Sequence, residues 1–135
     1  MSKGLGIVLY SGRADTLVLA GVLAQTAANF DMPVRIFVTS FATPYFMKEK
    51  PEPKVPEEFK DWGQKMFEGM AKMGAKSWYD MLKEAKELGD VKIMVCSMTM
   101  EALGYSEDQV DPIVDGVVGA ATFLAEMADF EVIFV

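Results

Sequence analysis

The sequence contains no histidine and a single cysteine, Cys96. The missing imidazole excludes serine–histidine–aspartate triads, cysteine–histidine pairs, and haem or zinc sites that use histidine ligands. One cysteine cannot close a disulfide within the chain, and it also excludes a CxxC redox or metal motif. Any thiol chemistry must therefore be carried by Cys96 and completed by groups that other molecules supply.

Positive charge is the second deficit. Lys and Arg number 13 against 20 Asp and Glu, and the formal net charge is −7. Binding of nucleic acid or of an anionic membrane surface needs a basic face, so we expect neither as a partner. The apolar runs are too short, or too interrupted by charge, for a signal peptide or a membrane span. We therefore expect a cytoplasmic protein.

A length of 135 residues with 51% hydrophobic composition suits a single domain over residues 1–135. Short apolar and β-branched runs predict strands at 5–10, 34–38, 91–96, 114–118 and 131–135. Helical patterns lie between them, at 14–28, 57–73, 77–88, 97–103 and 119–128, and a capping-box pattern at Ser106 predicts a further helical turn. Strands that alternate with helices predict a mainly parallel sheet covered by helices on both faces.

Two features lie between the second and third predicted strands. Thr39 to Pro56 holds four of the six prolines and many charges, and we predict a loop, densest in proline and charge at 42–56, that is either a solvated connector or a lid over the site. The next helix carries an apolar stripe, which we expect to pack inward. Its members are Phe59, Trp62, Met66, Phe67, Met70 and Met73. A chain of this size has difficulty burying the whole stripe, so part of it is expected at a subunit interface.

Ligands of parallel sheets bind beyond the carboxyl ends of the strands, and three strand ends carry polar residues. These residues are Ser11, Gly12, Thr39, Cys96 and Ser97. Cys96 stands where a strand passes into a helix, so backbone N–H groups of Ser97, Met98 and Thr99 are expected to face its sulfur and lower its pKa moderately. Arg13 would add to this effect if the first turn lies nearby.

Spacing tests exclude several known cysteine chemistries. A phosphatase loop needs Arg six residues after its Cys, and that position is Ala102. A rhodanese-type loop also needs a basic residue there, whereas Glu101 is acidic. A thioredoxin-fold peroxidase has Thr three residues before its Cys, and that position is Ile93. A thiol that accepts a group and passes it on remains compatible with the sequence.

Two other interpretations of Cys96 stay open. A lone cysteine after an apolar strand is often an inert, buried small residue. The neighbouring Met94, Met98 and Met100 could bind Cu(I) together with the thiolate, although one thiolate without histidine makes a weak set of ligands. We expect no metal and no cofactor.

The segment Val95–Gly104 resembles the C-x-M-[ST]-M-x-x-x-G segment of DsrE/DsrF-like proteins, in the branch often named "peroxiredoxin family protein". Phe37–Phe41 resembles the family's Phe-x-Thr-Phe strand end with Ser40 inserted, and Val114–Phe123 resembles its V-D-G-[IV]-x-x-A-A-x-F segment. Val132–Val135 fits its last strand. The resemblance extends over nearly the whole chain, with the middle loop the least similar part.

The resemblance implies a three-layer α/β/α fold with a five-stranded sheet, assembled as a homo-oligomer, often a trimer or hexamer. It also implies sulfur relay, in which Cys96 carries a persulfide or thiosulfonate between donor and acceptor proteins. Ser97, Met98, Thr99, Ser11, Gly12 and Thr39 are the candidate substrate-binding residues. The alternatives are an oligomer that binds a nucleotide or small anion beside an inert cysteine, and a purely structural scaffold.

Overall fold

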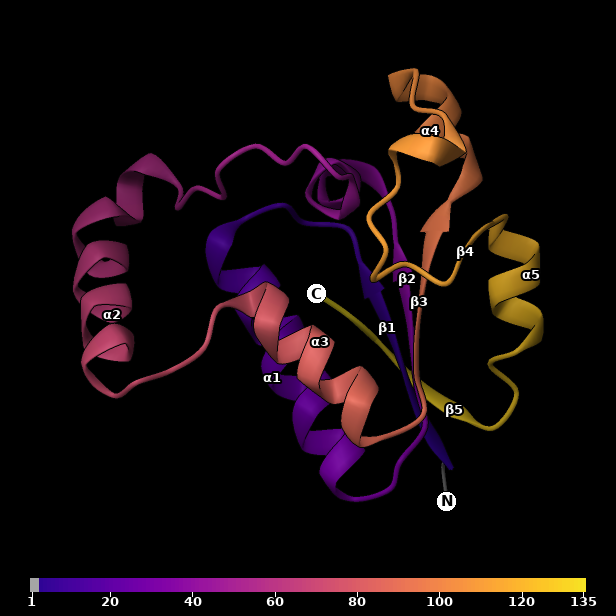
Figure 1. The fold of residues 1–135 in the computed structure, drawn as a ribbon, viewed down its shortest axis with the longest axis horizontal. Coiled ribbons are helices and arrows are strands. Elements are labelled where there is room, and N and C mark those ends of the chain that lie inside the picture. The colour runs from indigo at the N-terminus through magenta and orange to yellow at the C-terminus, as the bar shows by residue number, and fades with distance from the viewer. Residues whose placement is uncertain (1–2) are drawn as a thin grey trace.

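The computed structural model describes residues 3–135, which form one five-stranded sheet. The strands are β1 (Gly4–Leu9), β2 (Val34–Val38), β3 (Val91–Cys96), β4 (Gly116–Val118) and β5 (Phe130–Phe134). Their order in the sheet is β4-β3-β2-β1-β5, and every neighbouring pair is parallel. All five strands therefore run in the same direction, upward in Figure 1, and end at the same edge of the sheet. The predicted α/β class is confirmed.

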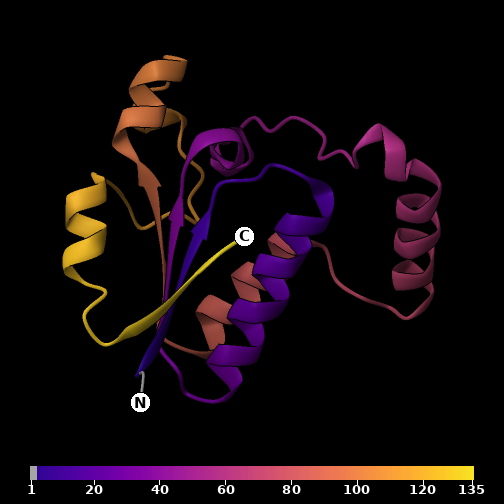
Figure 2. The ribbon, with the colours of Figure 1, turned by 180° about the vertical axis from the view of Figure 1, so that it is seen from behind.

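Helices cover both faces of this sheet (Figures 1 and 2). α1 (Ala14–Asn29) and α3 (Trp78–Leu88) lie on one face, and α5 (Ala120–Ala125) lies on the other. Alternate strand residues face opposite layers: Ile36 and Val38 join the larger core with α1 and α3, whereas Phe37 joins a smaller core with α5. Because both faces are covered, the strands are almost continuously apolar, as is typical of buried parallel sheets. The predicted three-layer arrangement is confirmed.

The helix ends follow their sequence signals. Ser77 precedes α3, and its Oγ accepts a hydrogen bond of 3.1 Å from the Asp80 N–H. The predicted capping box at Ser106 is present before the 3-10 helix η3 (Glu107–Gln109). α4 (Ser97–Leu103) ends at Gly104, whose φ of 77° favours glycine because a side chain is strained there. α4 begins at Ser97, directly after the last residue of β3.

The predicted loop from Thr39 to Pro56 is wrong over its first part. Ser40–Phe46 forms a 3-10 helix, η1, in which Ala42, Thr43 and Phe46 are buried. The prolines and charges that suggested a loop lie mostly after residue 47, whereas the residues of η1 are largely apolar and pack on the core. The remainder leads to a second 3-10 helix, η2 (Glu57–Phe59), and Lys48 donates its N–H to the Gln109 carbonyl at 2.8 Å.

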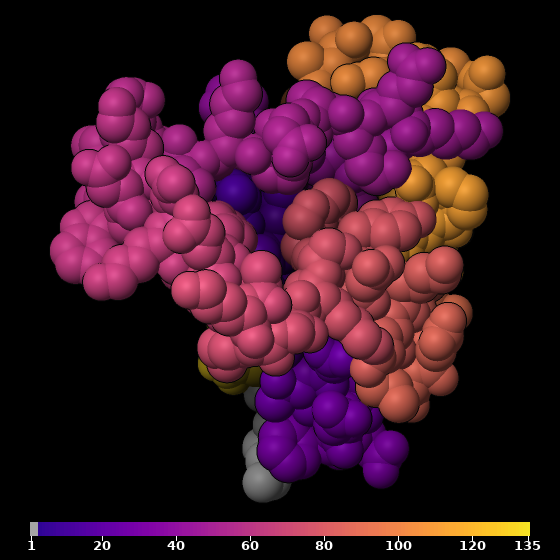
Figure 3. Space-filling model, turned by 60° about the vertical axis from the view of Figure 1, so that its left-hand side comes forward, coloured from indigo at the N-terminus to yellow at the C-terminus, as the bar shows by residue number. Residues whose placement is uncertain are grey.

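α2 (Lys60–Lys72) stands apart from the sheet (Figures 1 and 3). Within this helix Gly63 is the one buried residue, while Trp62 is 72% exposed and Met73, just after the helix, is 83% exposed. The predicted inward packing of the stripe is therefore wrong within one chain, although Phe67 and Met70 are half-buried and face α1 and α3 across a cavity of about 520 Å³. Within residues 3–135, no helix has the length and apolarity needed to cross a bilayer.

Candidate functional site

Cys96 ends β3 at the carboxyl edge of the sheet and immediately precedes α4. It pairs with Val118 of β4, and Val95 pairs with Val38 of β2, so the residue after Val38, Thr39, lies beside Cys96 on the other side. The thiol belongs to the smaller core with Phe37, which faces α5, and Cys96 is 7% exposed. Sheet register therefore brings two sequence-predicted residues, Thr39 and Cys96, into one site.

A pair of threonines encloses the thiol. Thr39 Oγ1 lies 3.3 Å from Thr99 Oγ1, which in turn accepts a hydrogen bond of 3.2 Å from the Ser40 N–H. Ser40 adopts a left-handed backbone conformation with φ of 52°, which is uncommon for a residue with a side chain. A hydroxyl can accept one hydrogen bond and donate another, so Thr99 remains able to donate to the sulfur. The sequence had suggested both threonines but not their contact.

These neighbours determine the acidity of Cys96. Burial raises the pKa of the thiol, but hydrogen bonds from the Thr99 N–H and hydroxyl, the Thr39 hydroxyl and the Met98 N–H favour the thiolate. The net result is a pKa below the ordinary value for cysteine. The direction agrees with the expectation from the sequence. Arg13, which would have added to this effect if the first turn lay nearby, is not among the groups that shift this pKa, and its guanidinium pairs with Asp15 at 2.8 Å.

The outer wall of the site comes from the first turn of α4. Ser97 and Met98 are exposed there, Met98 by 78%, while Thr99 is half-buried beneath them. Phe41, at the start of η1, is 80% exposed. The sulfur therefore has polar donors on one side and the smaller apolar core on the other, and the exposed side chains of Met98 and Phe41 project from α4 and η1 next to it.

Ser11 and Gly12, two further candidate residues, lie in a different hollow. This hollow of about 430 Å³ is lined by Gly12, Phe41 and Tyr45, among others, and Cys96 does not line it. A Cβ on Gly12 would come within 2.4 Å of the Phe41 carbonyl oxygen, so glycine is required for η1 to approach the turn after β1. The structure therefore brings Thr39, Met98 and Thr99 to the thiol, but not Ser11 or Gly12.

The methionines do not gather around the sulfur as a copper site requires. Met94 shares the smaller core with Cys96, Met100 is buried in the larger core, and Met98 is exposed. No group of three or more His, Cys, Asp or Glu side chains within residues 3–135 could hold a metal ion. The Cu(I) interpretation therefore has no assembled ligand set among these residues.

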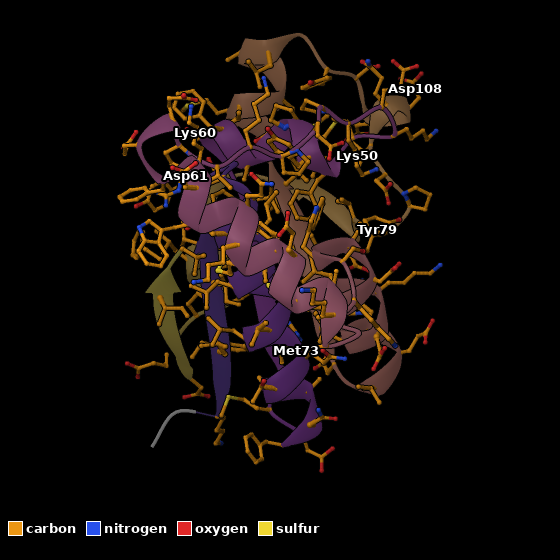
Figure 4. All side chains as sticks on the ribbon, turned by 90° about the vertical axis from the view of Figure 1, so that its left-hand side faces the viewer. Lys50, Lys60, Asp61, Met73, Tyr79 and Asp108 are labelled. Carbon is orange, nitrogen blue, oxygen red and sulfur yellow. The ribbon has the colours of Figure 1, made fainter. Side chains whose placement is uncertain are left out.

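One cluster at the carboxyl end of η1 was missed by sequence reasoning. Asp111 is buried and accepts hydrogen bonds from Lys50 Nζ at 2.5 Å, from the Tyr79 hydroxyl at 2.8 Å and from the Ile113 N–H at 2.8 Å. Its own N–H donates to the Phe46 carbonyl at 2.9 Å, so it ties the end of η1 to Tyr79 of α3. Its partners Lys50 and Tyr79 are labelled in Figure 4. The available signal was an acidic residue within the apolar run around Val110 and Ile113.

Burial and the neighbouring hydrogen-bond donors have opposite effects on the pKa of Asp111. Burial raises the pKa of Asp111, but the hydrogen bonds from Lys50, Ile113 and Tyr79 outweigh it and leave that pKa below its usual value. Burial and the neighbouring carboxylate raise the pKa of Tyr79 to about 12. Asp111 is thus ionised and Tyr79 is neutral near pH 7, which suits a fixed structural tether for η1.

Comparison with solved structures shows the same fold. The ychN protein from E. coli superposes with a TM-score of 0.60 at 13% identity, covering 98% of this chain and 99% of that one. MTH1491 from Methanobacterium thermoautotrophicum, a protein of unknown function, superposes with a TM-score of 0.52 at 13% identity, covering 97% of this chain and 99% of that one.

Comparison of sequences shows the family. The uncharacterized protein YrkE of Bacillus subtilis (strain 168) is 30% identical over 149 residues, which cover 93% of this chain and 91% of YrkE. The sequence profile of the DsrE/DsrF/DrsH-like family matches residues 41–134, a range that includes Cys96, α5 and all of η1 except Ser40. The chain belongs to the DsrE/DsrF/DrsH-like family.

Proposed function

We propose that this protein is a cytoplasmic sulfur carrier or sulfurtransferase whose carrying group is Cys96. The observation that supports this most strongly is the arrangement of Thr39, Met98 and Thr99, which favours the thiolate of a cysteine that is otherwise buried. A cysteine that only fills space in a core needs no such hydrogen-bond donors, whereas the reaction rate of a nucleophilic cysteine depends on the fraction present as thiolate. Family membership and the position of Cys96 at the carboxyl edge of a parallel sheet agree with this function.

The chemistry is an exchange that requires no oxidant or reductant. The Cys96 thiolate attacks the outer sulfur of a donor persulfide, a bond forms between the two sulfur atoms, and the donor leaves as a thiolate with the electrons of the broken S–S bond. A thiolate on an acceptor protein then attacks the outer sulfur, and Cys96 leaves as a thiolate. With thiosulfate as the donor, the leaving group is sulfite. With tetrathionate, Cys96 gains a thiosulfonate and thiosulfate leaves.

The hydroxyls of Thr39 and Thr99 would act on both forms of Cys96, the free thiolate and the form that carries sulfur. Thr39 and Thr99 stabilise the free thiolate, and the same donors are suitably placed for the negative charge of a bound persulfide or thiosulfonate. Ser97 and Met98 form the entrance from α4. The chain has no second cysteine, so transfer takes place between molecules. The exposed Phe41 and Met98 are suited to contact donor and acceptor proteins.

The assembly that we propose for this function is a homo-oligomer, with a trimer or hexamer favoured by the family alone. The large exposed apolar residues of α2 support association in general terms. Because Cys96 carries sulfur without a histidine or a second thiol, we propose no peroxidase activity, no metal and no cofactor for it.

The alternative function is binding of a nucleotide or small anion beside an inert cysteine. The hollow at Ser11 and Gly12 favours this alternative, because Arg13 and Lys54 line it. The two functions differ in where a ligand binds, so they are separable by a variant that changes one site alone.

Transfer to an acceptor tests the carrier function directly. Protein loaded with sulfane sulfur from a persulfide donor is separated from the donor and mixed with a small thiol acceptor. We expect loss of the bound sulfur and appearance of the acceptor persulfide, both absent in Cys96→Ser. Cys96→Ser that still delivers sulfur would contradict the proposal, and Lys54→Ala serves as the control because Lys54 lies in the other hollow.

A further inference from the structure

Two separate segments of the chain form the polar side of the Cys96 site. Residues 39–50 contain η1, and residues 96–111 contain α4 and η3. We call the first segment the η1 wall and the second the α4 wall. They meet beside the thiol, where Thr39 Oγ1 lies 3.3 Å from Thr99 Oγ1. The position of one wall relative to the other therefore determines which hydrogen-bond donors reach the sulfur.

The two walls meet a second time at their far ends. The Asp111 N–H donates to the Phe46 carbonyl at 2.9 Å, and the Lys48 N–H donates to the Gln109 carbonyl at 2.8 Å. The residues between these two pairs form an antiparallel bridge. Because the walls are joined both at the thiol and at this second junction, a displacement at the junction is carried along η1 to the thiol.

The side chain of Asp111 fastens the second junction. Its carboxylate accepts hydrogen bonds from Lys50 Nζ at 2.5 Å and from the Tyr79 hydroxyl at 2.8 Å. Lys50 Nζ also lies 5.2 Å from the centre of the Tyr79 ring, and Figure 4 labels both residues. Lys50 belongs to the η1 wall, Asp111 to the α4 wall and Tyr79 to α3. One carboxylate thus holds both walls against the body of the protein.

Stability alone is a poor reason for a carboxylate at this place. Asp111 is buried, and a buried ion pair is often no more stabilising than apolar side chains of the same volume. Its hydrogen bonds, in contrast, act only at particular distances and angles. They determine where Lys50 and the end of η1 lie, which apolar contacts would fix less narrowly. The chemistry of this residue therefore suits positioning.

The other end of η1 supplies donors to the thiol. The Ser40 N–H donates to Thr99 Oγ1 at 3.2 Å, so the hydrogen of that hydroxyl is directed to another acceptor. Thr39 lies immediately before η1, and its hydroxyl favours the Cys96 thiolate. η1 has seven residues and spans roughly 14 Å, so a shift at Phe46 moves both of these donors.

We propose that Asp111 is a positioning residue for the Cys96 thiol, and that its ion pair with Lys50 clamps the η1 wall to the α4 wall. The clamp keeps the hydroxyls of Thr39 and Thr99 within reach of the sulfur. Asp111 acts through the two walls, since it is not among the groups that shift the Cys96 pKa directly. The inference rests on the proposed function only in taking Cys96 as the reacting group.

The pH profile of Cys96 alkylation by iodoacetamide tests the clamp in the full chain. Asp111→Asn and Lys50→Met should each move the profile to higher pH by roughly half a unit or more, because fewer donors then oppose the effect of burial. Lys50→Arg keeps the cation and should restore the wild-type profile. Asp90→Asn is the matched control and should leave the profile unchanged, since Asp90 pairs with Arg35 at 3.1 Å just before β3 begins, at the opposite edge of the sheet.

Two results of this experiment would overturn the positioning role. One is a wild-type profile in both Asp111→Asn and Lys50→Met. The other is an equal shift in Asp90→Asn, which would show that any loss of an ion pair has the same effect. Circular dichroism confirms that each variant is folded, and Lys50→Met decides the question if Asp111→Asn does not fold.

A double-mutant cycle tests the route through the hydroxyls. In a background that carries both Thr39→Val and Thr99→Val, Asp111→Asn should move the profile no further, because the groups through which it acts are missing. A shift of the same size in both backgrounds would contradict the proposed route. Alkylation needs no sulfur donor or acceptor. A failure of the clamp is thus distinguished from a failure of the carrier function, which the transfer experiment on the wild type decides.

Discussion

Thr39 Oγ1 and Thr99 Oγ1 lie 3.3 Å apart, although the two residues are separated by 60 positions in the sequence. The parallel pairing of β2 with β3 brings them together, one after each strand and both beside Cys96. Neither hydroxyl is needed to complete the sheet. Their common effect is on the sulfur, whose thiolate both of them favour.

Replacing Thr99 should weaken the thiolate. Thr99→Val keeps the shape of the side chain but removes its hydroxyl. The pKa of Cys96 should then rise, because burial raises this pKa and one of the hydrogen bonds that lower it is lost. Reaction with iodoacetamide at a fixed neutral pH should slow, and its pH profile should move to higher pH. Thr99→Ser should restore the profile, and Thr122→Val, in exposed α5, should leave it unchanged. A Thr99→Val profile identical to that of the wild type would show that the hydroxyl has no effect on the thiol.

The burial of Cys96 predicts selectivity by reagent size. Cys96 is 7% exposed, so a small reagent that transfers a methylthio group should form a mixed disulfide with it much faster than a bulky aromatic disulfide does. In denaturant the two rates should approach their ratio for a free cysteine peptide. Stopped-flow absorbance measures both rates, and equal accessibility in the folded protein would be inconsistent with the buried position of the thiol.

Asp111 should make stability depend on acid pH. Its pKa is lowered in the folded protein, so its ionised form stabilises the fold above the pKa of the unfolded chain. That contribution is lost as pH falls through the lowered folded value. Asp111→Asn should lower the free energy of unfolding by about 1–3 kcal/mol near pH 7, because Lys50 and Tyr79 lose a charged acceptor.

Urea unfolding at a series of pH values measures this dependence. The difference between wild type and Asp111→Asn should shrink towards acid pH. Tyr79→Phe should cost about 1 kcal/mol, since one hydrogen bond is removed. A difference that stays constant with pH would rule out ionised Asp111 as its source.

Gly12 should control the position of η1. A Cβ there would lie 2.4 Å from the Phe41 carbonyl oxygen, so Gly12→Ala must displace η1 and should destabilise the protein by about 1–3 kcal/mol. Because Thr39 immediately precedes η1, the thiol should also become less acidic. Gly116→Ala is the control, since no described atom lies within 4 Å of a Cβ at that position. Thermal unfolding and thiol titration of the two variants should therefore differ clearly.

Much of the sheet and its carboxyl edge was predictable, because buried parallel strands leave apolar runs that end at turn residues. The runs before Thr39 and Cys96 predicted the candidate site at this edge, and Ser77 and Ser106 marked helix starts. The five strands were also predicted from apolar runs, whereas the sulfur-relay role proposed for Cys96 came from the family resemblance and not from residue patterns alone.

The remaining errors have physical causes. The α2 stripe has the periodicity of a core-facing helix, but periodicity does not tell which surface, or whose, covers it. Prolines suggested a loop over η1, although a 3-10 helix tolerates Pro44 and buries its apolar neighbours. Ser11 shares the sheet edge with Cys96, but the packing of η1 against Gly12 separates their hollows.

The measurement that tests the sulfur-carrier function most directly is the intact mass of the protein after incubation with a persulfide donor, thiosulfate or tetrathionate across a pH series. The wild type should gain one sulfur atom, or a thiosulfonate with tetrathionate, and dithiothreitol should remove it. Uptake should fall at low pH as the Cys96 thiolate is protonated, and Cys96→Ser should gain nothing while it stays folded. A wild type that gains no mass with any of these donors at any pH would contradict the account.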